Sequence, residues 1–144
     1  NRPLTLSLGE VLQHMQLKAR TPQIALQPVY LGGPVHRVRV FVIHKSPWQG
    51  ELTLPIGAEL AVTASRDIMV ALAEGAYTDP ALIALGYAGW GEGQLEQELI
   101  ANTWLSGQAD ARILFEVPDE RRWAEAAALM GVDISRLSGE AGHA

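Results

Sequence analysis

The feature that most constrains the fold is a glycine-rich junction at residues 86–93. An apolar run over residues 81–87 leads into this junction. Four of the eight junction residues are glycines. Directly after it, the apolar positions change from strand-like to helical spacing. A strand that passes into a helix through bare backbone brings amide groups close to another chain segment or to a ligand. The sequence therefore predicts a strand–loop–helix unit with a close contact at its loop.

The rest of the chain alternates between strand and helix patterns, which indicates an α/β fold of the α+β type. We expect about five strands in a mixed, curved β-sheet flanked by helices. They form a single domain over residues 1–137, followed by a flexible polar tail at 138–144. The strand candidates cover residues 28–31, 38–44, 51–54 as a short edge strand, 59–63, 81–87 and 113–117. The expected helices begin at a capping box of Ser7 and Glu10, at Ser65 as N-cap, after residue 93, and at Asp119, with Trp123 and Ala127 facing inward in the last.

Composition narrows the function classes. With 48% hydrophobic and 19% charged residues, the chain is globular rather than disordered. It has no cysteine, which excludes disulfides, thiolate metal sites and cysteine nucleophiles, and its four histidines lack the spacing of a zinc site. Its apolar runs are shorter than the ~20 residues of a membrane-spanning helix. We therefore expect a cytoplasmic protein with no metal, no cofactor and no membrane segment.

The distribution of charge bears on nucleic-acid binding. The formal net charge is −5, with seven Lys and Arg against three acids in residues 1–66 and four against thirteen in residues 67–144. The best basic patch is Arg37, Arg39 and Lys45, and no helix-turn-helix pattern accompanies it. Because DNA binding depends on neutralising phosphates, direct DNA binding is not expected. The charge asymmetry either marks a partner surface or is neutralised where the two halves meet.

Three short segments supply the candidate ligand-binding residues. They are Gly89, Trp90, Gly91, Gly93 and Gln94 in the loop, then Gly32 with Gly33, and Arg66 with Asp67. Loop amides at the start of a helix can cradle an anion, although this loop lacks the Lys-Ser/Thr pair of a P-loop. The alternative is close packing of the glycines with Trp90 as a plug. In that case a methyl group at Gly91 lowers stability by about 1 kcal/mol.

Other polar residues support structural roles as readily as functional ones. Asp67 can hold the start of a helix while Arg66 reaches a carboxylate elsewhere. Glu92, Glu96 and Glu98 form either a solvated acidic helical turn or a weak divalent-ion site. No serine or threonine stands in a nucleophile-elbow motif, so no catalytic residue is identified and a binding role is favoured over an enzymatic one.

Motifs along nearly the whole chain resemble, in order and spacing, the AlgH/YqgE family of bacterial proteins. These motifs are residues 30–35 (YLGGPV), 41–44 (FVIH), 63–68 (TASRDI), 86–91 (GYAGWG), 94–99 (QLEQEL), Asn102, 104–105 (WL), 113–115 (ILF) and 142–144 (GHA). The resemblance implies a mixed, curved sheet with flanking helices in a bacterial, cytoplasmic protein. Family members begin roughly thirty residues earlier, a span that holds two ordinary strands, so the resemblance also implies that an N-terminal segment is missing here.

The resemblance also bears on function. Members of the AlgH/YqgE family carry the label of transcriptional regulator, from a link to alginate production, and no catalytic residues are established for them. Because the charge pattern disfavours direct DNA contact, we expect an indirect regulatory role through a protein or small-ligand partner. The alternative is an anion- or small-molecule-binding protein, or an enzyme, that uses the Gly86–Gly93 loop.

Overall fold

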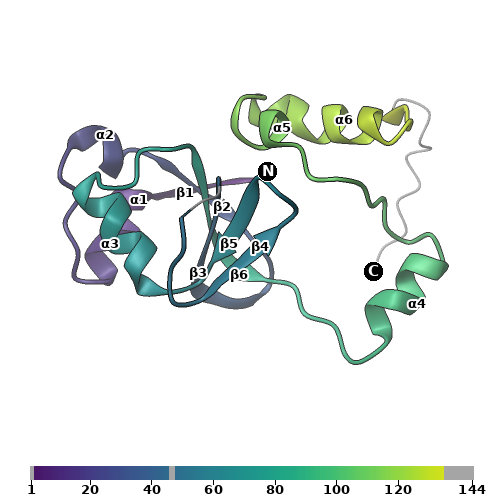
Figure 1. The fold of residues 1–144 in the computed structure, drawn as a ribbon, viewed down its shortest axis with the longest axis horizontal. Coiled ribbons are helices and arrows are strands. Elements are labelled where there is room, and N and C mark those ends of the chain that lie inside the picture. The colour runs from purple at the N-terminus through teal and green to yellow at the C-terminus, as the bar shows by residue number, and fades with distance from the viewer. Residues whose placement is uncertain (1, 46–47, 135–144) are drawn as a thin grey trace. The chain divides into compact units, whose positions relative to one another are not determined.

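The structure is a computed structural model that describes residues 2–45 and 48–134. The chain divides into two compact units, residues 1–89 and residues 90–144 (Figure 1). The first unit contains the sheet and the helices packed on it, and the described part of the second is helical. The α/β class with a mixed sheet is thus confirmed. The single-domain limits 1–137 stay a prediction, and the tail expected at 138–144 lies outside the described residues.

The sheet of the first unit has six strands, in the spatial order β1-β2-β6-β3-β5-β4. Their bounds are Pro3–Ser7 (β1), Pro28–Leu31 (β2), Val35–Lys45 (β3), Thr53–Ile56 (β4), Leu60–Thr63 (β5) and Ala81–Tyr87 (β6). β2 and β6 pair in parallel, whereas every other neighbouring pair is antiparallel. The sheet is therefore mixed, as predicted. The expected edge strand is present as β4, two residues later than the sequence pattern placed it.

The most apolar strand, β6, occupies an inner position of the sheet. It pairs with β2 on one side and with β3 on the other, at Val29 opposite Ile83 and Val42 opposite Ile83. A strand with neighbours on both sides has its backbone hydrogen bonds satisfied within the sheet, and apolar side chains suit that inner position. The hydrophobic run over residues 81–87 accounts for the central place of β6.

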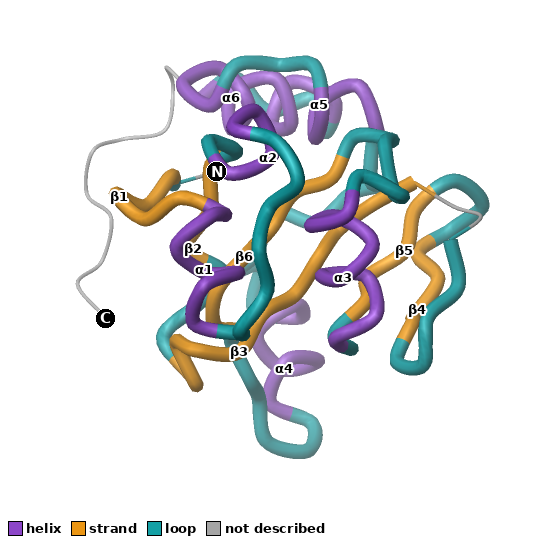
Figure 2. Tube along the Cα trace, turned by 90° about the vertical axis from the view of Figure 1, so that its left-hand side faces the viewer, coloured by secondary structure: helices purple, strands orange, loops and turns teal. Residues whose placement is uncertain are grey.

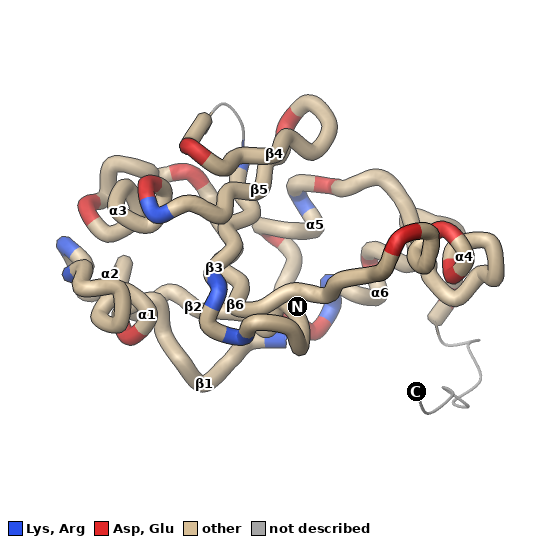
Figure 3. The backbone as a smooth tube through the Cα atoms, turned by 90° about the horizontal axis from the view of Figure 1, so that it is seen from below, with Lys and Arg blue, Asp and Glu red and all other residues tan. Residues whose placement is uncertain are grey.

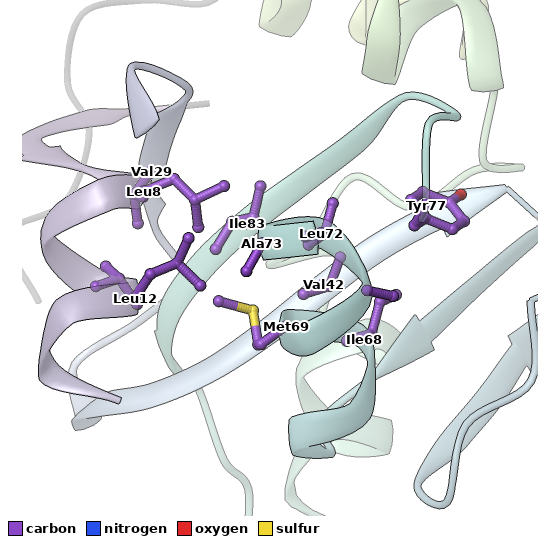
Figure 4. Close-up of a cluster of buried hydrophobic side chains, with 12 residues drawn as sticks. Leu8, Leu12, Val29, Val42, Ile68, Met69, Leu72, Ala73, Tyr77 and Ile83 are labelled. Atoms are coloured by element: carbon purple, nitrogen blue, oxygen red, sulfur yellow. The ribbon is translucent and has the colours of Figure 1, made fainter. Parts of the chain in front are cut away.

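Three helices of the first unit cover one face of the sheet (Figures 1 and 2). They are α1 (Leu8–His14), α2 (Pro22–Ala25) and α3 (Arg66–Glu74). Between these helices and the sheet lies a cluster of buried apolar side chains (Figure 4). Its fully buried members include Leu8, Leu12, Val29, Val42, Ile68, Met69 and Ile83. Each large aliphatic side chain buried in this way contributes about 1.5–3 kcal/mol, so this face holds the first unit together.

The helix starts in this unit depend on side-chain caps. The capping box at α1 forms as predicted, because the Ser7 amide donates to Glu10 Oε2 at 2.8 Å and the Glu10 amide donates to Ser7 Oγ at 3.4 Å. Pro22 is the first residue of α2. The Thr21 hydroxyl caps this single turn by accepting from the Ile24 amide at 3.4 Å. Proline suits the first helical position because its missing amide would have no partner there.

Two polar side chains, His44 and Thr63, are completely buried in the sheet. His44 Nδ1 lies 2.9 Å from the Lys45 carbonyl, which can only accept, so Nδ1 carries a proton. In the neutral ring Nε2 then accepts from the Thr63 hydroxyl at 2.8 Å. Thr63 Oγ1 in turn accepts from Thr53 Oγ1 at 2.8 Å, and Thr53 Oγ1 accepts from the Gly50 amide at 2.8 Å. This chain of hydrogen bonds satisfies every member and joins β3, β4 and β5.

The second unit contains α4 (Gln94–Ile100), α5 (Ala111–Phe115) and α6 (Asp119–Leu129). The strand predicted at residues 113–117 was wrong, because these residues form α5 and the turn after it. The Asp110 carboxylate accepts from the Ile113 amide at 3.0 Å and so caps α5. Short apolar runs do not distinguish a strand from a buried helical turn, and this side-chain cap favours the helix.

The last helix begins at its predicted position, but one of the side chains expected to face inward does not. α6 starts at Asp119, with Pro118 rather than Asp119 at the N-cap position. Ala127 is buried as expected, whereas Trp123 is exposed. Glu125 pairs with Arg112 at 3.0 Å and with Arg121 at 2.6 Å, which links α5 to α6 on the exposed side.

Candidate functional site

The loop that follows β6 leads into a group of hydrogen-bonded side chains, which we call the indole cluster. It consists of Trp90, Gln94, Glu98 and Trp104 together with the Gly91 amide. Glu98 Oε2 accepts from Trp104 Nε1 at 2.6 Å and from Trp90 Nε1 at 3.1 Å. The two indoles meet edge to face with 5.7 Å between ring centroids. One carboxylate oxygen therefore fixes two tryptophans that are fourteen positions apart in the sequence.

Gln94 completes the indole cluster from the first turn of α4. Its Nε2 donates to Glu98 Oε1 at 3.1 Å, and its Oε1 accepts from the Gly91 amide at 3.0 Å. Hydrogen bonds from Trp104 and then Trp90 lower the pKa of the Glu98 carboxyl below its ordinary value of 4.5. The carboxylate is therefore kept ionised, as an acceptor for both indoles.

The indole cluster adjoins exposed apolar side chains on the same segment. Ile100 is 82% exposed, and Leu99, Trp104 and Leu105 are also exposed. Residues 90–111 contain four acidic residues and no Lys or Arg. The acidic positions on α4 are visible in Figure 3. This segment presents an apolar surface with a purely negative charge around it.

Gly32 and Gly33 lie against the end of β6. The Gly32 amide donates to the Leu85 carbonyl at 2.8 Å. A Cβ atom on Gly33 would stand 2.6 Å from the Ala88 amide nitrogen and closer still to the Tyr87 carbonyl group. Because real Cβ atoms do not approach backbone so closely, these glycines let two backbone segments pack together. The close contact predicted for the end of β6 is therefore made by another chain segment.

In the loop itself the glycines have different roles. Gly93 has φ +74°, the left-handed conformation that favours glycine, and it stands at the N-cap of α4. Gly91 has no such constraint, since an added Cβ would meet only Gln94 Oε1, at 3.8 Å. A methyl group at Gly91 therefore has room, contrary to the cost expected from close packing at that position.

The Asp67 carboxylate joins the start of α3 to the loop before β4. Its Oδ1 accepts from Ser65 Oγ at 2.5 Å and from the Ile68 amide at 2.9 Å, and its Oδ2 accepts from the Glu51 amide at 3.0 Å. Ser65 stands at the N-cap position but does not cap the helix, because its hydroxyl donates to Asp67 and accepts from the Leu52 amide at 3.1 Å. The hydrogen bond from Ser65 lowers the pKa of the Asp67 carboxyl below its ordinary value of 3.8. These contacts support the structural interpretation of Asp67.

Arg66 points to a different part of the first unit. Its guanidinium NH1 donates to the Met15 carbonyl at 2.9 Å, at the C-terminal end of α1, rather than to a carboxylate. Beside it lies a cleft of about 220 Å³, which we call the Arg66 cleft. It is lined by Met15, Val38, Val40, Val42, Thr63, Ala64, Ser65, Arg66 and Met69. The sequence pattern gave no sign of this cleft, because its walls come from three separate stretches of the chain.

By their contacts, the candidate residues fall into distinct groups. Gly32 and Gly33 meet the end of β6, Trp90, Gly91 and Gln94 join the indole cluster, and Arg66 and Asp67 make contacts of their own. The sequence interpretation missed the role of Glu98 and Trp104. The available signal for this role was the spacing of Glu98, which stands eight positions after Trp90 and six before Trp104. A ligand-binding role for these residues stays a prediction.

Comparison with known proteins places this geometry in a family. The model of the AlgH-like family matches residues 1–135. The chain belongs to the AlgH-like family. A UPF0301 protein of Nitrosococcus oceani is 51% identical over 144 residues, covering 100% of this chain and 77% of its own. One from Methylococcus capsulatus is 45% identical over 143 residues, covering 99% of this chain and 76% of its own. The family expected from the motifs is confirmed.

A solved structure supports the AlgH-like fold directly. The solution structure of the AlgH protein from Pseudomonas aeruginosa is similar with a TM-score of 0.77 and 46% sequence identity, over 100% of this chain and 76% of that protein. In the described part of this AlgH-like chain, none of the helices is both long enough and apolar enough to cross a membrane.

Proposed function

We propose that this AlgH-like protein acts indirectly in the regulation of transcription, by binding a protein partner through the surface around the indole cluster. The observation that carries this proposal is the pair of indoles fixed by Glu98 beside exposed Leu99, Ile100 and Leu105. Tryptophans held in a fixed geometry lose little conformational freedom on binding, and they are the residue type most enriched at the energetic centres of protein interfaces.

The charge of this surface defines the partner. Residues 90–111 carry four acidic residues and no basic one, so a nucleic acid would be repelled, whereas a basic segment with apolar side chains is complementary. The regulatory part of the proposal comes from the label of the AlgH/YqgE family. A cytoplasmic location, which such a role requires, is part of the same proposal.

Site-specific crosslinking in the bacterium that encodes the protein tests this proposal. A photo-reactive amino acid at Ile100, which is 82% exposed, should capture one defined protein, whereas the same group at Leu26, which is 77% exposed in the first unit, should not. With the captured partner purified, Ile100→Asp should weaken binding at least about tenfold, a change of roughly 1.4 kcal/mol. Leu26→Asp should leave the affinity unchanged.

Transcript levels then connect binding to regulation. Ile100→Asp should change the same transcripts as deletion of the gene, and Leu26→Asp should change none. Equal crosslinking from both positions, or an unchanged affinity in Ile100→Asp, would overturn the proposed surface. A loss of thermal stability in Ile100→Asp as large as that of a core substitution would do the same, because the side chain would then be packed inside the folded chain.

The alternative function, an anion-binding or enzymatic site on the Gly86–Gly93 loop, has less support. The Gly91 amide already donates to Gln94 Oε1, so an anion at that amide would have to displace an internal acceptor. A thermal-shift titration with phosphate and with a nucleotide tests this alternative. A concentration-dependent stabilisation of the wild type that is lost in Gln94→Glu would favour the loop over the partner surface.

A further inference from the structure

The Arg66 cleft lies on the helix-covered side of the sheet, between the end of α1 and the start of α3. Val38, Val40 and Val42 alternate along β3 and so share one face of the strand. Val42 and Met69 are buried at the floor, whereas Val38 is 89% exposed at the other end of the row. The cleft is therefore an apolar trough with one open end.

Arg66 is the cationic residue of this trough. Across the described residues, its guanidinium makes no ion pair with a carboxylate within 4.0 Å. The adjacent Asp67 does not pair with it either, and the Asp67 oxygens accept instead from the Ser65 hydroxyl and from the Glu51 and Ile68 amides. Arg66 NH1 donates one hydrogen bond to the Met15 carbonyl, and the other N–H groups of the guanidinium can donate to a ligand.

The lining restricts the chemistry of a ligand. The Ser65 and Thr63 hydroxyls already take part in internal hydrogen bonds, so Arg66 is the group that recognises charge. A single guanidinium matches a single negative charge, and a carboxylate can accept two parallel N–H hydrogen bonds from it. The valines and methionines suit a hydrocarbon body. With about 220 Å³, the cleft is smaller than the pockets that hold drug-sized molecules, so the ligand must be small.

We propose that the Arg66 cleft binds a small monocarboxylate with a branched or aromatic apolar body. The carboxylate pairs with the Arg66 guanidinium, and the apolar body lies along the row of Val38, Val40 and Val42. Asp67 fixes the backbone at the start of α3 through Glu51 and Ile68 and so positions Arg66. This site is independent of the indole cluster, so neither proposal depends on the other.

Titration of the full chain with defined probes tests the site. Amide shifts are followed by NMR with benzoate, with isovalerate, with uncharged benzamide and with inorganic phosphate. Benzoate or isovalerate should give saturable shifts at Val40, Ala64 and Arg66, with a Kd of the order of 1 mM. Benzamide should bind at least about tenfold more weakly, because it lacks the charge. Phosphate should not saturate these positions.

Two matched pairs of variants distinguish binding in the Arg66 cleft from the effect of changing a similar residue elsewhere. Arg66→Gln should weaken carboxylate binding about tenfold or more, whereas Arg20→Gln should not, although Arg20 also donates to a backbone carbonyl, that of Glu74. Val38→Asp places a negative charge at the open end of the Arg66 cleft, where it would repel the carboxylate of the ligand, so it should abolish binding. Leu54→Asp, at another exposed strand position, should not. Melting curves without ligand establish that each variant is folded.

Several results would overturn this proposal. They are no saturable shift with either carboxylate, equal affinity for benzamide and benzoate, and unchanged affinity in a folded Arg66→Gln variant. Saturation by phosphate at the same amides would also count against it, because it would show a general anion site. Should Arg66→Gln fail to fold, Val38→Asp decides, since its side chain is exposed and makes little contribution to the core.

Discussion

Thr63→Val is the sharpest test of how the first unit is held together. The Thr63 hydroxyl links a completely buried histidine to the next threonine, with 2.8 Å to His44 Nε2 and 2.8 Å to Thr53 Oγ1. Valine keeps the branched shape but removes both hydrogen bonds. His44 Nε2 then lacks a donor in a site without water access, and the Thr53 hydroxyl loses its acceptor.

The cost can be worked from these two losses. A buried acceptor left without a partner costs about 1–3 kcal/mol, and the half-buried Thr53 hydroxyl adds about 1 kcal/mol. The free energy of unfolding should therefore fall by about 2–4 kcal/mol. At this chain length each kcal/mol lowers Tm by about 3 °C, so the decrease in Tm should be about 6–12 °C.

Urea denaturation followed by circular dichroism measures this change. Thr5→Val is the matched control, because Thr5 lies exposed on strand β1 and its substitution should cost less than about 0.5 kcal/mol. The double variant Thr53→Val/Thr63→Val should cost less than the sum of the single ones, because both remove the same hydrogen bond. A Thr63→Val variant as stable as Thr5→Val would refute the reasoning, as would nitrogen NMR showing a neutral His44 with its proton on Nε2.

Substitutions at glycines, the pH dependence of stability and an assay of DNA binding give further tests. Gly33→Ala should lower the free energy of unfolding by about 2 kcal/mol or more, because the added Cβ would meet the Tyr87–Ala88 backbone. Gly91→Ala should change it by less than about 0.5 kcal/mol, because the added Cβ has room. Thermal unfolding of the two variants measures the difference, and equal melting temperatures would contradict the prediction. The lowered pKa of Asp67 means that its contribution to stability is present above its ordinary value of 3.8 and is lost as the pH falls through the folded-state value. Stability measured between about pH 5 and pH 2 should therefore fall more steeply for the wild type than for Asp67→Asn, and parallel curves would refute this. In a gel-shift assay at low salt, the protein should show no sequence-selective binding of duplex DNA, and selective binding below about 1 µM would overturn this expectation.

Most of the strand and helix pattern of the first unit was predictable because local signals and burial agree there, whereas strand β1 and the single turn α2 were not predicted. The capping box at Ser7, the alternation along β3 and the apolar run of β6 each specify one structure. The helix α5 was not predictable from periodicity, since residues 113–117 are as apolar as a short strand. Its determining contact is the Asp110 side chain, which accepts from the Ile113 amide at 3.0 Å. A single cap of this kind outweighs a weak strand preference.

The candidate sites were predictable only where the chain is locally continuous. Trp90 and Gln94 stand within one loop and one helical turn, so their closeness in space follows from the sequence. The contribution of Trp104 depends on a turn after α4 that brings its indole back to Glu98. The Arg66 cleft depends on β3, β5, α1 and α3 meeting in space, and sequence spacing holds no information on that meeting. Sites assembled from distant segments need the tertiary structure.

The position of β6 between β2 and β3 has a consequence for how the chain folds as it is synthesised. β2 and β3 are joined by residues 32–34 yet do not pair with each other, because β6 separates them. Until residue 87 has left the ribosome, β6 is incomplete, so neither β2 nor β3 has its full partner along the edge that faces β6 in the folded sheet. Such edges are the usual sites of aggregation, and parallel pairing between distant segments forms slowly. We therefore expect the nascent chain to be most exposed to misassembly between the synthesis of β3 and that of β6.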